Sequence, residues 1–252
     1  MFGQGFVGKL AFPSANVSDR LEKTFTSVNF NMMIMIIYAL ITIAIFGMWY
    51  YARYEGNFLP SPKKTFNPMM IVAIVILVPG TQFAANFIAN LTGYIRPDWL
   101  QQYNELFETS GITDTTFVTV LYSVILAPIC EELIFRGVTM RCARKALPFA
   151  LANLMQAALF GLFHLNWIQG IYAFALGIVL GYVCERGGSI YYSMGLHLLF
   201  NLWGTLSGFF PDPGNSVVVF VVVIVVTIVS LVAGFVLFNK GRRKLPINST
   251  GI

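Results

Sequence analysis

Apolar residues along the chain gather into long runs, which short polar or Gly/Pro-bearing breaks separate. A helix needs about 20 mostly apolar residues to cross the hydrocarbon core of a bilayer. The pattern predicts an all-α, polytopic integral membrane bundle of about seven transmembrane helices. These runs lie at 30–51, 66–91, 117–135, 149–163, 168–184, 189–209 and 217–238. The link between the fourth and fifth runs is tight, and a re-entrant turn is the alternative reading there.

Composition agrees with this pattern and excludes several other classes of protein. The 252 residues are 57% hydrophobic and 11% charged, whereas roughly a quarter of the residues in soluble domains are charged. A disordered chain, a coiled coil and a disulfide scaffold are therefore excluded. The three cysteines contain no CxxC pair, so no thiolate zinc site is indicated.

The charges indicate an orientation rather than a nucleic-acid surface. Lys+Arg 16 exceeds Asp+Glu 11, and most basic residues lie in short loops after the first, third and seventh runs. Such loops are expected on the cytoplasmic side and in contact with anionic lipid headgroups. This orientation places the amino terminus outside. The basic residues concerned are Arg53, Lys63, Lys64, Arg141, Arg144, Lys145, Lys240, Arg242, Arg243 and Lys244.

The third run holds ionisable residues, which a membrane helix normally avoids. A charged side chain at the bilayer centre costs roughly 3 kcal/mol on insertion scales, so Glu131, Glu132 and Arg136 are functional candidates. Glu132 precedes Arg136 by four residues, the favourable order for an intrahelical ion pair. Glu131 points about 100° away from Glu132. The chain's two histidines, His164 and His197, lie at or within later runs.

Helical spacing groups the remaining candidates. His197 and Asn201 are four residues apart and share one helix face, as do Phe160 and His164. Pro128 removes a backbone hydrogen bond and is expected to kink the third helix beside the carboxylates. If these helices face one another, a carboxylate, two imidazoles and a carboxamide meet in one pocket.

Such a set of groups suits hydrolysis of a peptide bond by an activated water. A desolvated carboxylate is a stronger base and a neighbouring imidazole shares its proton, the roles expected for Glu131 and His164. Donors aimed at the carbonyl oxygen stabilise the charge that develops there, the roles expected for His197 and Asn201. The chain lacks GxSxG, and the carboxylates beside Cys130 disfavour its thiolate.

Three segments resemble the motifs of a known family. EELIFRG at 131–137, FGLFH at 160–164 and HLLFN at 197–201 are similar to the EExxxR, FxxxH and HxxxN/D motifs of the CAAX protease and bacteriocin-processing (CPBP, or Abi) family of intramembrane proteases. The resemblance implies a helical, glutamate-dependent rather than metal-dependent endopeptidase. Its eukaryotic Ras-converting member removes a tripeptide after prenylation of a CAAX cysteine. The segment ALGIVLGYVCERGGSIYYSMGLH looks like the bacterial branch, which implies a bacterial plasma membrane.

The resemblance also carries roles onto individual residues. Glu131 and His164 activate water, and His197 with Asn201 form the oxyanion site; Glu132, Arg136 and Phe160 support them. It implies no cofactor and no metal. The expected partners are a peptide or protein substrate and the lipid bilayer. The expected organisation is an amino-terminal segment with two spans at 1–116, a CPBP-like catalytic core at 117–209, and a last helix with a basic tail at 210–252.

Other functions stay open on the sequence. A zinc protease using His164, His197 and a glutamate is chemically reasonable, although HExxH is absent. A non-catalytic bacteriocin immunity or scaffold protein of the same fold is a second alternative. A proton-coupled transporter is a third, although no internal repeat is visible.

Overall fold

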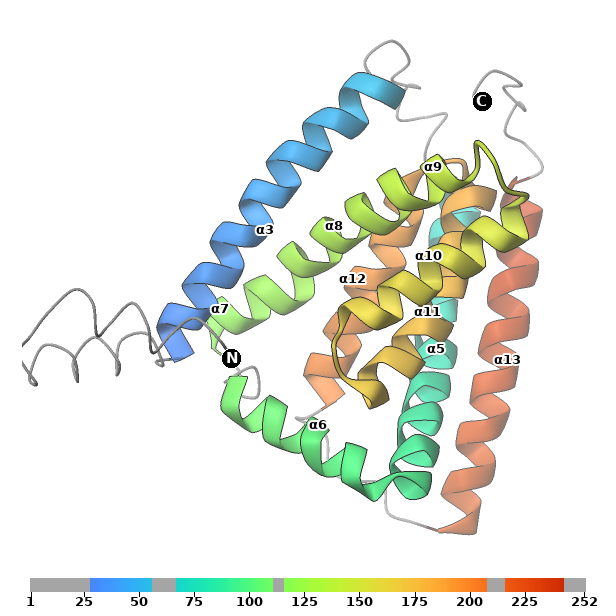
Figure 1. Cartoon of the computed structure of the whole chain (residues 1–252). Coiled ribbons are helices and arrows are strands. Elements are labelled where there is room, and N and C mark those ends of the chain that lie inside the picture. The colour runs from blue at the N-terminus through green and yellow to red at the C-terminus, as the bar shows by residue number, and fades with distance from the viewer. Residues whose placement is uncertain (1–27, 56–66, 111–115, 208–215, 243–252) are drawn as a thin grey trace, which may run out of the picture.

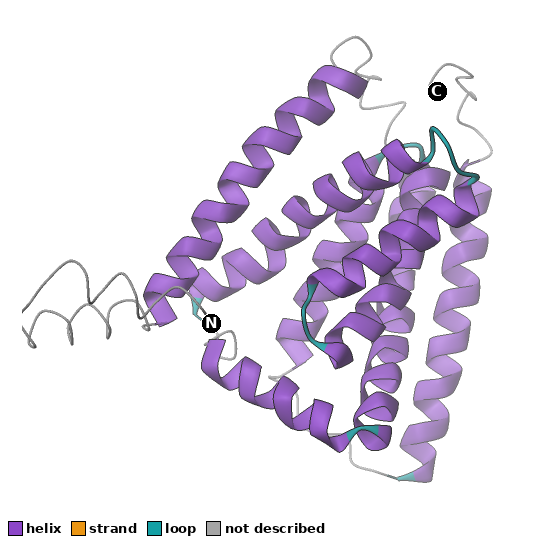
Figure 2. Cartoon of the chain, viewed as in Figure 1, coloured by secondary structure: helices purple, strands orange, loops and turns teal. Residues whose placement is uncertain are grey.

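The computed structural model describes residues 28–55, 67–110, 116–207 and 216–242. Within these ranges the regular structure is entirely helical, with short connecting loops (Figure 2). The prediction of an all-α membrane bundle is therefore confirmed. The separate helices are α3 (Val28–Tyr50), α5 (Pro68–Ile95), α6 (Pro97–Ser110), α10 (Phe149–Phe163), α11 (Trp167–Gly187), α12 (Ile190–Ser207) and α13 (Val217–Arg242).

One further helix runs without interruption from Phe117 to Ala143, and we call it the α7–α9 helix. Two π-helical stretches alternate in it with α-helical turns, an irregularity that frequently marks functional sites. Its parts are α7 (Phe117–Val120), a first π-helical stretch (Leu121–Leu126), α8 (Ala127–Glu132), a second π-helical stretch (Leu133–Met140) and α9 (Arg141–Ala143).

Five of the described helices are long and apolar enough to cross a membrane, so the predicted count of seven spans is not confirmed. They are Met32–Arg53, Pro68–Ile95, Phe117–Ala143, Trp167–Gly187 and Val217–Arg242. The fourth predicted run forms α10, which has only 15 residues. The sixth forms α12, where His197, Asn201 and two serines lower the hydropathy. Both helices nevertheless lie within the bundle (Figure 1).

The carboxyl ends of α3, the α7–α9 helix and α13, which carry basic residues, lie at the same end of the molecule (Figure 1). Asn67, before α5, donates its backbone N–H to the Tyr192 hydroxyl (2.8 Å) and its side-chain amide to the Gly241 carbonyl (2.8 Å). Arg144, after the α7–α9 helix, pairs with Glu185 near the end of α11. The grouping agrees with the predicted cytoplasmic end, whose sidedness stays a prediction. Lys63, Lys64, Arg243 and Lys244 lie outside the described residues.

At the other end, α6 crosses the bundle near the end of α5 (Figure 1). Trp99 of α6 stacks on Trp167 at the start of α11, with ring centroids 5.3 Å apart. Arg96 and Asp98 form an exposed ion pair beside this stack. From α6 the chain returns to the site-bearing α7–α9 helix.

The α5–α13 interface shows how a proline is tolerated inside a membrane helix. Pro79 lies within α5 and has no N–H to donate. Ser230 of α13 inserts its hydroxyl at this point, where it accepts from the Gly80 N–H (2.9 Å) and donates to the Ile76 carbonyl. A side chain from a neighbouring helix thus bonds the backbone groups that have no partner within α5.

Replacement of this serine should destabilise the bundle. Ser230→Ala removes the partner of two buried backbone groups, so we expect a loss of about 1–3 kcal/mol and a lower Tm in detergent. Thr227→Val is the matched control on α13, because the Thr227 hydroxyl bonds only the Val223 carbonyl of its own helix. Equal Tm values for the two variants would contradict the bridging role of Ser230.

Candidate active site

The first π-helical stretch of the α7–α9 helix brings a backbone carbonyl out of the helical hydrogen-bond ladder. Here the N–H of Ala127 bonds the carbonyl of Tyr122, five residues back. In the same register the Ser123 carbonyl faces Pro128, which has no N–H. The side-chain amide of Asn201 on α12 donates to that carbonyl instead (2.8 Å). Because Pro128 leaves the Ser123 carbonyl without a backbone donor, this bond can form, and it holds Asn201 against the α7–α9 helix.

Glu132 and Arg136 form a fully buried ion pair one helical turn apart, as the spacing predicts. The Arg136 Nη1 donates to Glu132 Oε1 (2.8 Å), and both side chains are 0% exposed. The Arg136 Nη2 donates to the carbonyl of Gly177 on α11 (3.3 Å). The guanidinium also lies 4.5 Å from the centroid of the Phe160 ring. This pairing and the cation–π contact compensate the cost of removing both charges from water.

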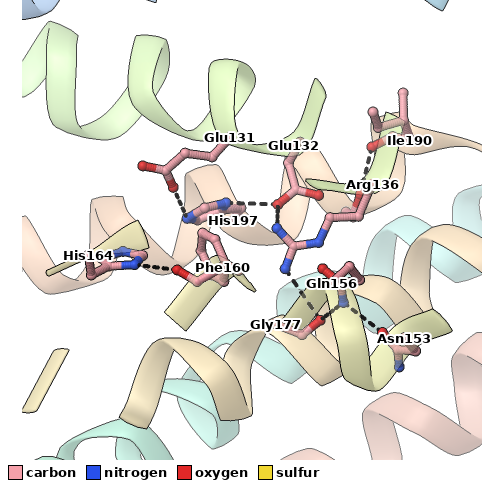
Figure 3. A network of polar contacts seen from close by, with 11 residues as sticks. Glu131, Glu132, Arg136, Asn153, Gln156, Phe160, His164, Gly177, Ile190 and His197 are labelled. Carbon is pink, nitrogen blue, oxygen red and sulfur yellow. Dashed lines mark hydrogen bonds and ion pairs between the residues drawn. The ribbon is translucent and has the colours of Figure 1, made fainter. Parts of the chain in front are cut away.

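His197 lies between the two glutamates (Figure 3). Its Nδ1 is 2.9 Å from Glu132 Oε1, and its Nε2 is 3.6 Å from Glu131 Oε2. The first contact is a hydrogen bond that fixes the ring, and the second is slightly longer than one. Because a carboxylate only accepts, Nδ1 carries a proton and Nε2 is the nitrogen facing Glu131. The Glu131 side chain is 17% exposed, whereas that of Glu132 is fully buried.

His164 and Phe160 lie beside this cluster at the end of α10. The His164 Nδ1 donates to the Phe160 carbonyl (2.8 Å). A carbonyl only accepts, so Nδ1 carries the proton and Nε2 keeps its lone pair. The edge-on Phe160 ring contacts both imidazoles, with centroids 4.9 Å from His164 and 5.7 Å from His197. Phe160 thus separates the two histidines.

The structure does not join every predicted site residue directly. It brings together Glu131, Glu132, Arg136 and His197 through one chain of contacts (Figure 3). In the part of the chain that the structure describes, no direct hydrogen bond or ion pair links His164 or Asn201 to that chain of contacts. His164 reaches it through the Phe160 ring, and Asn201 lies one turn after His197 on α12.

Two buried amides on α10 that the sequence analysis missed bond backbone carbonyls of α11. The Gln156 side chain on α10 donates to this carbonyl (2.9 Å) and to Asn153 Oδ1 (2.7 Å). Asn153 donates in turn to the Ile178 carbonyl (3.0 Å). Gln156 and Arg136 therefore share one acceptor on α11. Two amides three residues apart in a short apolar helix were the signal that would have identified them.

Close approach of α10 to α11 depends on glycine. A Cβ on Gly181 would lie 1.9 Å from Asn153 Oδ1, and one on Gly177 would lie 3.1 Å from the Ala157 Cα. The GxxxG spacing of these two glycines thus lets the amides of α10 reach the carbonyls of α11. Among the described residues, no group of three or more His, Cys, Asp or Glu side chains has the arrangement of a metal site.

The segment that carries these residues matches the model of a known protein family. Residues 113–203 match the family model described as type II CAAX prenyl endopeptidase Rce1-like. That stretch of the chain is similar to the Rce1-like CAAX prenyl endopeptidases of the CPBP family. The family is a protease family, so the match supports a membrane CAAX-type endopeptidase. The matched segment contains all seven predicted site residues. No curated protein and no solved structure matches the chain.

Removal of Arg136 should destabilise the protein strongly. Arg136→Met leaves the Glu132 carboxylate buried without its cation, which typically costs about 3–5 kcal/mol. The matched control is Arg144→Met, because the Arg144–Glu185 pair is about a third exposed (33% and 32%) and such pairs contribute about 1 kcal/mol or less. Thermal unfolding in detergent should give a much lower Tm for Arg136→Met. A similar Tm for both variants would contradict the proposed importance of the buried pair.

Proposed function

We propose that this protein is an intramembrane endopeptidase that hydrolyses a peptide bond in a peptide or a membrane-proximal protein segment. The bacterial plasma membrane is its proposed location. The observation that carries the proposal is the difference between two adjacent glutamates. Glu132 is fully buried and bonded to Arg136 and His197, whereas Glu131 keeps partial exposure beside His197 Nε2. Full burial suits Glu132 to a structural role, and partial exposure suits Glu131 to act as a base on a water molecule.

Glu131 is the proposed general base, with His164 as its partner. Its carboxylate is partly exposed, so it can contact a water molecule and take a proton from it. The His164 tautomer, fixed by the Phe160 carbonyl, leaves an Nε2 lone pair that can take up a proton. Glu131 and His164 can thus share the proton taken from water and later return it to the leaving amine.

His197 and Asn201 are the proposed oxyanion donors. Glu132 fixes the His197 ring through Nδ1 and turns Nε2 toward the reaction site, where Nε2 donates when the ring carries a proton on both nitrogens. Asn201 uses one amide N–H for the Ser123 carbonyl, and its second N–H serves as the other donor. Donors held in place before the reaction stabilise developing negative charge without reorganisation.

The bond changes balance without a cofactor. Glu131 removes a proton from water while the water oxygen forms a bond to the scissile carbonyl carbon. The carbonyl π electrons move to oxygen, where the His197 and Asn201 donors bind the charge. Collapse re-forms the carbonyl and breaks the C–N bond, and the stored proton passes to the amine nitrogen. Arg136 and Phe160 act indirectly by holding Glu132 and the two imidazoles.

Replacement of the base tests the proposal. Glu131→Gln keeps the side-chain size and removes the base, so cleavage should fall by about 10²- to 10⁴-fold. The neighbouring Cys130→Ala is the control, because Cys130 is a buried free thiol with no proposed role. Native membranes from cells expressing each variant at equal levels are compared by terminus-selective peptide mapping.

The outcomes of this experiment separate the candidate functions. New peptide termini in the wild type and in Cys130→Ala that disappear in Glu131→Gln support the protease and identify its substrate. Identical termini in all three, with the cellular phenotype retained by Glu131→Gln, contradict catalysis. That result would favour the non-catalytic immunity or scaffold function.

Gln156 is the proposed positioning residue behind Arg136. In Gln156→Met the Gly177 carbonyl loses one of its two side-chain donors, and Arg136 is held less firmly against Glu132. We expect kcat on the identified peptide to fall between about 10- and 100-fold with KM unchanged, as for other displacements remote from the reacting atoms. The control is Tyr182→Phe, which removes a bond between α11 and α13 (Tyr182 hydroxyl to Asn239 Oδ1, 2.9 Å) that touches neither Gln156 nor Arg136.

The control distinguishes positioning from stability. If Gln156 only joined two helices, both variants would lower Tm and neither would lower kcat. The positioning role would then be wrong. A kcat effect confined to Gln156→Met supports the path from Gln156 through Gly177 and Arg136 to Glu132.

A further inference from the structure

Three amide side chains follow one another along one side of α5. Gln82, Asn86 and Asn90 are spaced four residues apart, so each lies about 6 Å along the helix from the next. Gln82 is 7% exposed, and Asn86 and Asn90 are exposed. We call these three residues the amide stripe. All three lie outside the segment that matches the family model.

The amide stripe does not join α5 to another helix, which is a common use of amides in membrane proteins. Gln82 Nε2 donates to Asn86 Oδ1 (3.4 Å), and Asn90 Nδ2 donates to the Asn86 carbonyl (2.8 Å). Among the described residues, both contacts thus stay within α5. The buried Gln82 Oε1 has no hydrogen-bond partner there. A buried acceptor without a partner is unfavourable, so this oxygen indicates a place for a further polar group.

The stripe lies at a depth where an exposed helix face meets lipid. Gln82, Asn86 and Asn90 are about 21, 27 and 33 Å along α5 from Pro68, given 1.5 Å per residue. The preceding residue, Asn67, bonds the basic end of α13. Because the hydrocarbon core is about 30 Å thick, the stripe runs inward from the core boundary opposite the basic end. Amides at this depth are costly against acyl chains and need polar partners.

The inner end of the stripe adjoins the proposed active site. α5 packs against α12, where a Cβ on Gly204 would lie 3.8 Å from Gln82 Nε2. Among the described residues, that Cβ would meet no other heavy atom within 4 Å. Packing therefore does not require this glycine, which is unfavourable inside a helix relative to alanine. It leaves space beside Gln82, about one helical turn after Asn201 on the same face of α12.

An extended peptide is the ligand whose chemistry matches the stripe. A substrate must leave the helical conformation where it is cleaved, and in lipid its backbone N–H and C=O groups then lack partners. A carboxamide carries both donors and an acceptor, so it bonds either kind of backbone group. The groups along one edge of an extended chain repeat every two residues, about 6.6–6.8 Å. That repeat is close to the spacing of the stripe.

We propose that the amide stripe binds the backbone of an extended substrate segment, which leads from the scissile bond toward the end of α5. The inference rests on the proposed protease function and adds a binding site beyond the reacting groups. Because the bonds are made to backbone groups, the stripe accepts many side chains. It selects instead for a segment that is extended rather than helical.

Kinetics with backbone-modified peptides test the stripe. The probe is a synthetic peptide that spans the cleavage site mapped in native membranes. Two further versions carry N-methyl groups on alternate residues, starting three residues before or three residues after the scissile bond. One of these versions should show a KM about tenfold higher with a similar kcat, because only binding is lost. Asn86→Leu and Asn90→Leu should each raise KM for the unmodified peptide about fivefold.

A double-mutant cycle assigns the effect to the backbone bonds. In Asn86→Leu combined with Asn90→Leu, the same N-methyl groups should raise KM less than about twofold, because their partners are already absent. Thr92→Val is the matched control and should leave KM and kcat unchanged. Thr92 lies about 200° around α5 from Asn90, and its hydroxyl bonds the Ile88 carbonyl of its own helix.

The outcomes separate the stripe from the proposed function. The Tm of the leucine variants should be equal to or above that of the wild type, since an exposed amide is removed from lipid. Cleavage with unchanged KM in both leucine variants, a lowered Tm in both, or an N-methyl effect that persists in the double variant would overturn the stripe alone. Absence of cleavage by the wild type would overturn the proposed function and the substrate role of the stripe with it.

Discussion

The buried ion pair of Glu132 and Arg136 is the constraint on which the rest of the site depends. Two charges that are fully removed from water need polar or aromatic partners, and three other helices supply them. His197 on α12 bonds the carboxylate, the Gly177 carbonyl on α11 bonds the guanidinium, and the Phe160 ring on α10 lies beside it. The pair thereby joins the α7–α9 helix to α10, α11 and α12, and α10 and α12 carry His164, His197 and Asn201.

Two prolines within membrane helices leave backbone groups without their usual hydrogen-bond partners, and in both places a side chain from another helix bonds these groups. Pro79 in α5 and Pro128 in the α7–α9 helix each leave backbone groups without their usual partner. A hydroxyl of Ser230 satisfies those beside Pro79, and the amide of Asn201 satisfies the Ser123 carbonyl beside Pro128. In a membrane no water can substitute for these partners. Asn201 thus has a structural contact with the α7–α9 helix one helical turn after His197.

The α7–α9 helix divides the bundle into two environments. Its Glu131 side faces His197 and the proposed reaction site, whereas Ile129 and Leu133 line a mostly apolar cavity between this helix, α3 and α12. Polar groups on the first side are interlinked, and glycines on the second leave space. One helix can present both faces because neighbouring residues point in directions about 100° apart.

The sequence by itself determined the helical membrane class, the Glu132–Arg136 pair and the identity of the candidate site residues. Those features follow from local rules: run length, the four-residue helical repeat and the cost of charge in lipid. It did not show that His197 bridges both glutamates, that Asn201 bonds the Ser123 carbonyl, or that Gln156 shares an acceptor with Arg136. The count of seven spans was not confirmed either, because α10 is short and α12 is too polar. The contacts of Gln156, His197 and Asn201 join residues 21 to 78 positions apart in the sequence. Only the packing of helices against one another decides which of these distant residues meet.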